Sequence, residues 1–194
     1  MGNPIDRKVF FAEIHHHPFG GPLTPAQVDG ITRILDEWER RKLTLLAWLA
    51  YMLATVFHET WREMQPIREK GSDSYLRAKP YWPWIGEGLV QVTWADNARK
   101  FGAQKPGDCL TWPVALRALF DGMINGVFTG RGLSHYFTAR LSDPINARRI
   151  INSLDQAQLI ASYFYAFLHA LSLAAHPALP ITVADKPVPL KAAA

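Results

Sequence analysis

The stretch LTLLAWLAYMLATVFHETWRE, residues 43–63, contains the longest apolar run in this chain of 194 residues. A helix that is apolar on all sides lies in the middle of a domain rather than on its surface. The run is shorter than the roughly 18 uncharged apolar residues of a membrane-spanning segment. We therefore predict a buried central helix and no membrane span. The large apolar side chains behind this prediction are Leu45, Leu46, Trp48, Leu49, Met52, Leu53 and Val56.

Helical patterns dominate the rest of the chain. Residues 7–16 carry apolar residues at helical spacing, and Thr24 followed by Pro25 is typical of a helix start. From there one apolar face is formed by Val28, Ile31, Leu35 and Trp38. Further helices are predicted over residues 94–101, 112–125, 133–141, 145–151 and 156–174. We therefore predict an all-α fold.

Length and composition indicate one globular domain with an extension. The chain is 48% hydrophobic and 20% charged, which is ordinary for a globular protein and excludes a wholly disordered or collagen-like chain. We assign residues 1–175 to a single domain. The proline-rich residues 176–194 are predicted to form an extended C-terminal tail.

Charge and cysteine content exclude several classes of function. The net charge of +4 is mild and the basic residues are scattered, so we predict no nucleic-acid partner. The single cysteine, Cys109, cannot form an internal disulfide, and we expect a structural thiol. His15, His16 and His17 cannot all face one way on a helix. We predict no metal site and no cofactor.

Glu59 stands near the end of the apolar stretch. A carboxylate close to a core is costly unless it is paired or protonated. Burial raises the pKa of a carboxyl group, which suits a general acid. The alternative is that Glu59 only pairs locally with Arg62, and both interpretations stay open on the sequence alone.

Residues 65–87 are rich in glycine and proline and are predicted to be irregular. Long loops in compact domains are usually functional. Glu69 lies in this segment, and Glu63 and Glu87 are rival partners for Glu59 in a glycosidase-like pair of carboxyl groups. The aromatic residues of the segment either stack on sugar rings or fix the loop to the core; they are Tyr75, Tyr81, Trp82 and Trp84. Beyond the segment, Thr93 and Asp96 resemble a capping box for the helix at 94–101.

Several motifs together resemble glycoside hydrolase family 19, the group of plant-type chitinases and phage or prophage endolysins. Residues 51–60, YMLATVFHET, resemble its catalytic-helix segment, and residues 64–71, MQPIREKG, the segment that follows. Residues 86–94, GEGLVQVTW, with Asn97 after them, resemble the stretch G-R-G-x-x-Q-L-T of the family. Residues 19–30 and 147–152 also look like the phage-like branch, so the resemblance spans about residues 5–170.

The resemblance implies a lysozyme-like helical fold and hydrolysis of a β-1,4-linked, N-acetylglucosamine-containing glycan with inversion. Glu59 matches the general acid of the family, and Glu69 is the best match for its general base. Amide side chains suit sugar hydroxyl and N-acetyl groups because they donate and accept hydrogen bonds. The residues expected to bind substrate are His58, Thr60, Tyr75, Trp84, Glu87, Gln91, Thr93, Asn97 and Asn152.

The chain also departs from the family pattern. Glu87 replaces the arginine of G-R-G, Ala98 replaces a tyrosine, and Ser153 replaces a glycine after Asn152. The stretch between Tyr75 and Gly86 is shorter than usual. These departures favour an alternative, in which the protein is a catalytically impaired relative that only binds glycan or has a structural role.

The expected function is that of an endolysin-like glycosidase whose partner is a polysaccharide. Peptidoglycan is favoured over chitin because the sequence shows no export signal, no chitin-binding module and no disulfide framework. We expect a monomer that is made in the cytoplasm and reaches the cell wall after release by another factor. A chitinase of the same family is the alternative.

Overall fold

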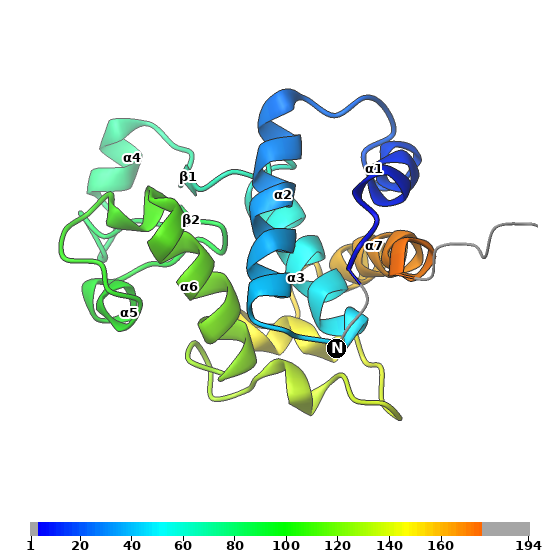
Figure 1. The fold of residues 1–194 in the computed structure, drawn as a ribbon. Helices are drawn as coiled ribbons and strands as arrows, with labels where there is room; N and C mark the ends of the chain where they lie inside the picture. Colours follow the sequence, from blue (N-terminus) through cyan, green and yellow to red (C-terminus); the bar gives the residue numbers. More distant parts are fainter. Residues whose placement is uncertain (1–3, 176–194) are drawn as a thin grey trace, which may run out of the picture.

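Helix α3 (Leu46–Glu59) forms the centre of the fold, as its sequence predicts (Figure 1). The computed structural model describes residues 4–175, so the predicted tail lies outside the described residues. Every residue of α3 from 49 to 57 is buried. The helix is shorter than predicted because the next residues turn away: Trp61 and Arg62 have positive φ angles of 54° and 70°. Glu59 is therefore its last residue.

Helices α1 (Arg7–His16) and α7 (Ala157–Ala175) lie side by side, and α7 packs against α3 (Figure 1). The backbone N–H of Asp6 donates to the carbonyl of Ala174 at 3.1 Å, which joins the start of one helix to the end of the other. The Phe57 ring of α3 meets the ring of Phe167 edge-on, with the ring centroids 5.8 Å apart. Helix α7 thus covers one side of α3, and α1 packs against α7.

Helix α7 is long and apolar enough to cross a membrane by length and composition, with a mean hydropathy of 1.3. No membrane-spanning segment was predicted from the sequence. In the structure one side of α7 packs against α3 and α1, and residues such as Phe164, Phe167 and Leu171 are buried. This packing is typical of a core helix. Core helices can be as long and as apolar as membrane-spanning ones.

Helices α2 (Pro25–Arg40) and α6 (Trp112–Ile124) pack near α3 on its other side (Figure 1). The predicted start of α2 is confirmed: the Thr24 hydroxyl accepts from the Gln27 N–H, and the Gln27 side chain accepts from the Thr24 N–H. This reciprocal pair satisfies two backbone donors that a helix start leaves free. The buried face of α2 includes Ile34, whereas Val28 lies on the exposed side.

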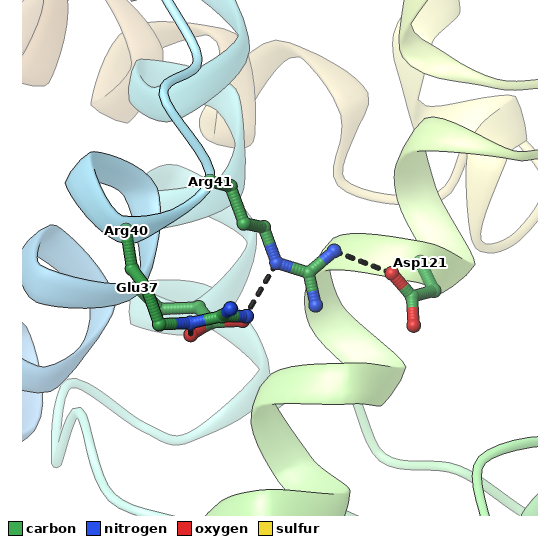
Figure 2. Close-up of polar contacts among 4 residues, drawn as sticks. All are labelled: Glu37, Arg40, Arg41 and Asp121. Carbon is green, nitrogen blue, oxygen red and sulfur yellow. Dashed lines mark hydrogen bonds and ion pairs between the residues drawn. The ribbon is translucent and has the colours of Figure 1, made fainter.

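A charged cluster joins α2 to α6 (Figure 2). Arg41 donates to Glu37 at 2.6 Å and to Asp121, and its guanidinium lies 4.9 Å from the centre of the Phe120 ring. Arg40 also donates to Glu37, through two nitrogens at 2.6 Å each. The two arginines hold the pKa of Glu37 down to about 2. Arg41 thus links the C-terminal end of α2 to α6.

The segment predicted as irregular contains short regular elements. Strands β1 (Ile67–Arg68) and β2 (Glu87–Gly88) form an antiparallel pair in which Ile67 faces Gly88. Between them lies α4 (Asp73–Arg77), which begins where the Ser72 hydroxyl accepts from the Tyr75 N–H. Figure 1 shows these elements, with α5 (Ala95–Lys100), on the side of the molecule away from α1 and α7.

Two of the helix predictions are wrong in detail. Trp94, the residue before α5, has a φ of 70° and no side chain caps the helix, so the capping box from Thr93 and Asp96 does not form. Within residues 133–141 only η2 (Leu133–His135) is helical. The Thr138 hydroxyl accepts from the N–H groups of Arg140 and Leu141, which closes a turn instead. The other 3₁₀ helices are η1 (Asp108–Leu110) and η3 (Asn146–Ile150).

The Glu37 cluster predicts how stability changes with pH. The pKa of Glu37 is about 2 in the folded protein, below the ordinary value of 4.5. A lowered pKa stabilises the folded state above the unfolded pKa, and this contribution disappears as the pH falls from about 4.5 towards 2. We expect Glu37→Gln to cost about 1–2 kcal/mol at pH 7 and much less at pH 2.5. Urea unfolding at both pH values measures this, with the exposed Asp96→Asn as the matched control.

Candidate active site

A cleft of about 580 Å³ opens beside the C-terminal end of α3. Its walls come from that helix end, from the β1–β2 region and from the first half of α7. Five of the residues predicted from sequence line it, including both glutamates that were predicted to be catalytic. They are His58, Glu59, Glu69, Gln91 and Thr93.

Glu59 is held by an ion pair with a buried arginine. The Arg148 Nη1 lies 2.5 Å from Glu59 Oε1, and the two side chains are only 4% and 15% exposed. The Nε of Arg148 donates to the carbonyl of Asp155 at 3.1 Å, which fixes the guanidinium in turn. Within the described part of the chain, Oε2 of Glu59 accepts no hydrogen bond. One oxygen of this carboxyl group is therefore anchored, and the other is available to the cleft.

The local alternative for Glu59, a pair with Arg62, does not occur. Arg62 lies instead with its guanidinium 5.4 Å from the centre of the Phe57 ring. Arg148 comes from η3, 89 residues further along the chain. This contact was not predicted from the sequence, because no local pattern shows which of the two adjacent arginines, Arg148 or Arg149, turns inward.

Glu69 is held by two uncharged donors. The Tyr81 hydroxyl donates to Oε1 at 3.2 Å and the Gly86 N–H donates to Oε2 at 3.0 Å. The backbone of Glu69 also pairs with the Gly86 carbonyl at 2.6 Å, which continues the β1–β2 pairing by one residue. Glu69 is thus fixed by the sheet on one side and by Tyr81 on the other.

Gly86 and Gln91 together position Glu69. A Cβ atom on Gly86 would lie 2.9 Å from Gln91 Oε1 and 3.3 Å from the Glu69 side chain, so only glycine fits without displacing them. The Gln91 amide donates to the carbonyls of Ile67 and Gly88, at 3.2 and 3.3 Å. Gln91 therefore braces the two strands while it lines the cleft.

His58 adds a neutral polar group to the cleft. Burial lowers its pKa below 6.5, and Arg148 acts in the same direction although Glu59 acts against it. The imidazole is therefore uncharged at neutral pH and can both donate and accept a hydrogen bond. Such a group suits a hydroxyl or an amide of a ligand.

The chain after Glu59 forms a tight turn with unusual backbone angles. Trp61, Arg62 and Met64 all have positive φ angles, which residues other than glycine rarely adopt. The buried Thr60 hydroxyl donates to the Val56 carbonyl and accepts from the Met64 N–H, so it holds both ends of this turn. Thr60 was predicted to bind substrate, but its hydroxyl is used inside the protein.

Helix α2 clamps this turn in place. Gln27 donates to the Arg62 carbonyl at 2.9 Å, and Gln65 donates back to the Ala26 carbonyl. A Cβ atom on Gly30 would lie 1.8 Å from the Met64 carbonyl oxygen, so the turn rests directly against the helix backbone. Trp61 and Arg62, which line the cleft, are therefore presented by a fixed turn.

Several residues expected to bind substrate lie elsewhere. Tyr75 is exposed on α4 with the Lys79 ammonium 4.0 Å from its ring centre. Trp84 is partly buried against the core. Asn97 accepts from Lys100, and Asn152 is exposed and accepts from the N–H of Ser153. None of these residues is among those that line the cleft.

Glu87 also lies away from the cleft lining. Its carboxylate is 5% exposed and accepts from the Gly107 N–H at 2.8 Å. Burial raises the pKa of Glu87, and the Gly107 hydrogen bond partly opposes this. Nearby, burial raises the pKa of Cys109 to about 11. The thiol is therefore protonated at neutral pH, in keeping with the structural role predicted for it.

The cleft thus brings together two fixed carboxyl groups from different elements, a neutral imidazole and an exposed indole. Two carboxyl groups that line one cleft are the groups that a glycosidase needs, one to donate a proton and one to accept a proton. Among residues 4–175, no group of three or more histidine, cysteine, aspartate or glutamate side chains is placed to hold a metal ion.

The contact between Gly30 and the turn predicts a strong effect of a single methyl group. We expect Gly30→Ala to lower the free energy of unfolding by about 2 kcal/mol or more, because the Cβ atom would overlap the Met64 carbonyl. Gly21→Ala is the matched control, since a Cβ atom there would meet nothing within 4 Å. Urea unfolding of both variants measures the difference, and equal stabilities would contradict the clamp.

The ion pair of Glu59 predicts a non-additive pair of substitutions. Arg148→Met should cost about 3 kcal/mol, because it leaves a largely buried carboxylate without its partner. The double variant Glu59→Gln/Arg148→Met should be more stable than Arg148→Met alone. A double-mutant cycle from urea unfolding measures this coupling. Additive effects of the two substitutions would show that the pair does not act as a unit.

Comparison of the chain with models of protein families, with curated proteins and with solved structures finds no match. The resemblance to glycoside hydrolase family 19 therefore rests on the individual motifs quoted above.

Proposed function

We propose that the protein is a glycoside hydrolase that cleaves β-1,4 bonds of an N-acetylglucosamine-containing glycan by inverting acid–base catalysis. One observation carries the proposal: Glu59 and Glu69, from two different elements, line the same cleft, and each is held by its own hydrogen-bond partners. Glycosidases need two such carboxyl groups, one on each side of the bond that is cut.

Glu59 is the general acid in this proposal. Arg148 anchors Oε1, so that Oε2 can carry the proton and deliver it to the glycosidic oxygen. The same guanidinium stabilises the carboxylate that remains after the proton has left. Glu59 lines the cleft and its side chain is 15% exposed, so a bound ligand can contact this carboxyl group.

Glu69 is the general base. Tyr81 and the Gly86 N–H orient the carboxylate of Glu69. Neither donor is charged, so neither adds a positive charge that would make the carboxylate a weaker base. A carboxylate held in this way can take a proton from a water molecule that attacks the anomeric carbon. The product would then have the opposite anomeric configuration, as inversion requires.

The wider proposal is a lysozyme-like fold with an endolysin-like role on peptidoglycan. The mostly helical architecture, with the cleft at the end of a buried helix, supports it, and so do the family 19-like motifs at Glu59 and Gln91. Chitin, as a polymer of the same sugar, is the second candidate substrate.

The test is clearing of a suspension of purified peptidoglycan, with soluble chitin oligomers in parallel. We expect Glu59→Gln and Glu69→Gln each to lower the rate by about 10²–10⁴-fold, since each removes one proton transfer. Glu13→Gln, on α1 and outside the cleft lining, is the matched control and should keep the parent rate. Circular dichroism checks that each variant is folded.

The anomeric form of the first product separates inversion from retention. A fresh digest of a β-linked oligomer should show the α-anomer by proton NMR before mutarotation. The absence of hydrolysis by the folded parent protein, or rates that do not depend on Glu59, would contradict the proposed activity. In that case, binding of glycan without cleavage would favour the impaired, glycan-binding relative.

A further inference from the structure

Two positively charged side chains, Arg62 and Lys70, line the same cleft as the two glutamates. Arg62 follows Glu59 by three residues, and Lys70 follows Glu69 directly. Both are exposed, so both can meet a ligand that enters the cleft. They are the two lysine or arginine residues of the lining, and the proposed acid–base chemistry uses neither of them.

Arg62 has a free positive charge in this arrangement. Within the described residues its guanidinium forms no ion pair; it lies over the face of Phe57. Its carbonyl is fixed by Gln27 and its φ is 70°, so the clamped turn sets the direction in which the side chain leaves the backbone. A guanidinium presented from a fixed turn loses less entropy when it binds a carboxylate.

Lys70 is held only weakly by its own neighbours. Its ammonium is 3.4 Å from Glu63, but both side chains are more than half exposed, and exposed pairs of this kind contribute little. The same ammonium lies 5.3 Å from the centre of the Trp61 ring, and Trp61 is itself 67% exposed in the cleft. An exposed indole with a cation beside it can stack on a sugar ring and bind an acidic group of that sugar.

The charges of the cleft are therefore divided into two groups. Arg148 is buried and neutralises Glu59, whereas Arg62 and Lys70 are exposed and face the entering ligand. A neutral polymer of N-acetylglucosamine offers these two cations no counter-charge. A glycan whose alternate sugars carry lactyl or peptide carboxylates does offer one.

We propose that Arg62, Lys70 and Trp61 form an anion-binding subsite that selects a carboxylate-bearing glycan, of the muramic acid type, over neutral chitin. This inference rests on the proposed function, because it concerns the same cleft and the same polymer. It assigns the choice between the two candidate substrates to named residues outside the acid–base pair.

The first test is binding, which does not depend on catalysis. Full-length protein carrying Glu69→Gln is sedimented with purified peptidoglycan, and with the same material after its carboxylates have been converted to amides. We expect amidation to weaken binding, and Arg62→Gln and Lys70→Gln each to weaken binding to the untreated form about fivefold. Arg62→Lys should keep part of the affinity because it keeps the charge.

Arg140→Gln is the matched control, because Arg140 is an exposed arginine outside the cleft lining. It removes the same net charge, so a general attraction between a basic protein and an acidic polymer would lower binding equally in this variant. An effect confined to Arg62 and Lys70 supports the subsite. Equal losses in all three variants, equal binding to amidated and untreated material, or no binding to either, would overturn it.

The second test compares rates in the catalytically intact protein. Here the quantity is the ratio of kcat/KM for peptidoglycan to kcat/KM for soluble chitin oligomers. We expect the double variant Arg62→Gln/Lys70→Gln to lower this ratio by about tenfold or more, mainly through KM. An unchanged ratio would overturn the subsite while leaving the proposed hydrolase intact. If the parent protein shows no hydrolysis that depends on Glu59, the proposed hydrolase activity is contradicted. The binding test then decides by itself whether the subsite exists.

Discussion

The ion pair between Glu59 and Arg148 is the constraint on which the site depends. Helix α3 is buried along almost its whole length, so a carboxylate at its end needs a partner inside the protein. The partner comes from η3 and is itself bound to the carbonyl of Asp155, just before α7. One buried guanidinium therefore fixes the end of the central helix, the short helix that carries Arg148 and the approach to the last helix. The position of the proposed acid is set by the same contact that holds these three elements together.

The turn after Glu59, which also lines the cleft, is fixed by backbone contacts rather than by charge. Three residues with positive φ follow Glu59, and such angles persist only where surrounding contacts determine them. Gln27 and Gly30 of α2 supply those contacts, through a hydrogen bond and through direct backbone packing. The start of α2, which carries its own capping pair, is therefore part of the support of the cleft although it does not line it.

The sequence predicts the helices of this structure better than it predicts the long-range contacts between them. Residues 7–16, the start at Thr24 and the buried stretch around Leu49 could be read from local patterns, because capping and periodicity act within one helix. Glu59 and Glu69 were predicted as a pair, and the structure places both in one cleft. The sequence did not predict that Arg148 binds Glu59, that Tyr81 binds Glu69 or that Gly30 packs on the turn, because these contacts span 12 to 89 residues and no local pattern encodes them. The helix predicted over residues 133–141 failed for the reverse reason: a local hydroxyl at Thr138 competes with helical hydrogen bonds.

Glu87 stands where the family pattern has an arginine, and its position in the structure makes this difference less important for the cleft. As a third carboxylate in the cleft, Glu87 would repel Glu59 and Glu69 and would hinder a base that has to lose and regain a charge. In the structure its carboxylate is buried against Gly107, and β2 carries it away from the cleft lining. The charge balance of the cleft then consists of the two glutamates on one side and Arg62, Lys70 and the buried Arg148 on the other. Glu59 is paired with Arg148 and Lys70 lies beside the exposed Glu63, so Arg62 is the cation of the lining that has no ionic partner among the described residues. An exposed guanidinium without an ionic partner in the cleft is consistent with an acidic polymer as the ligand.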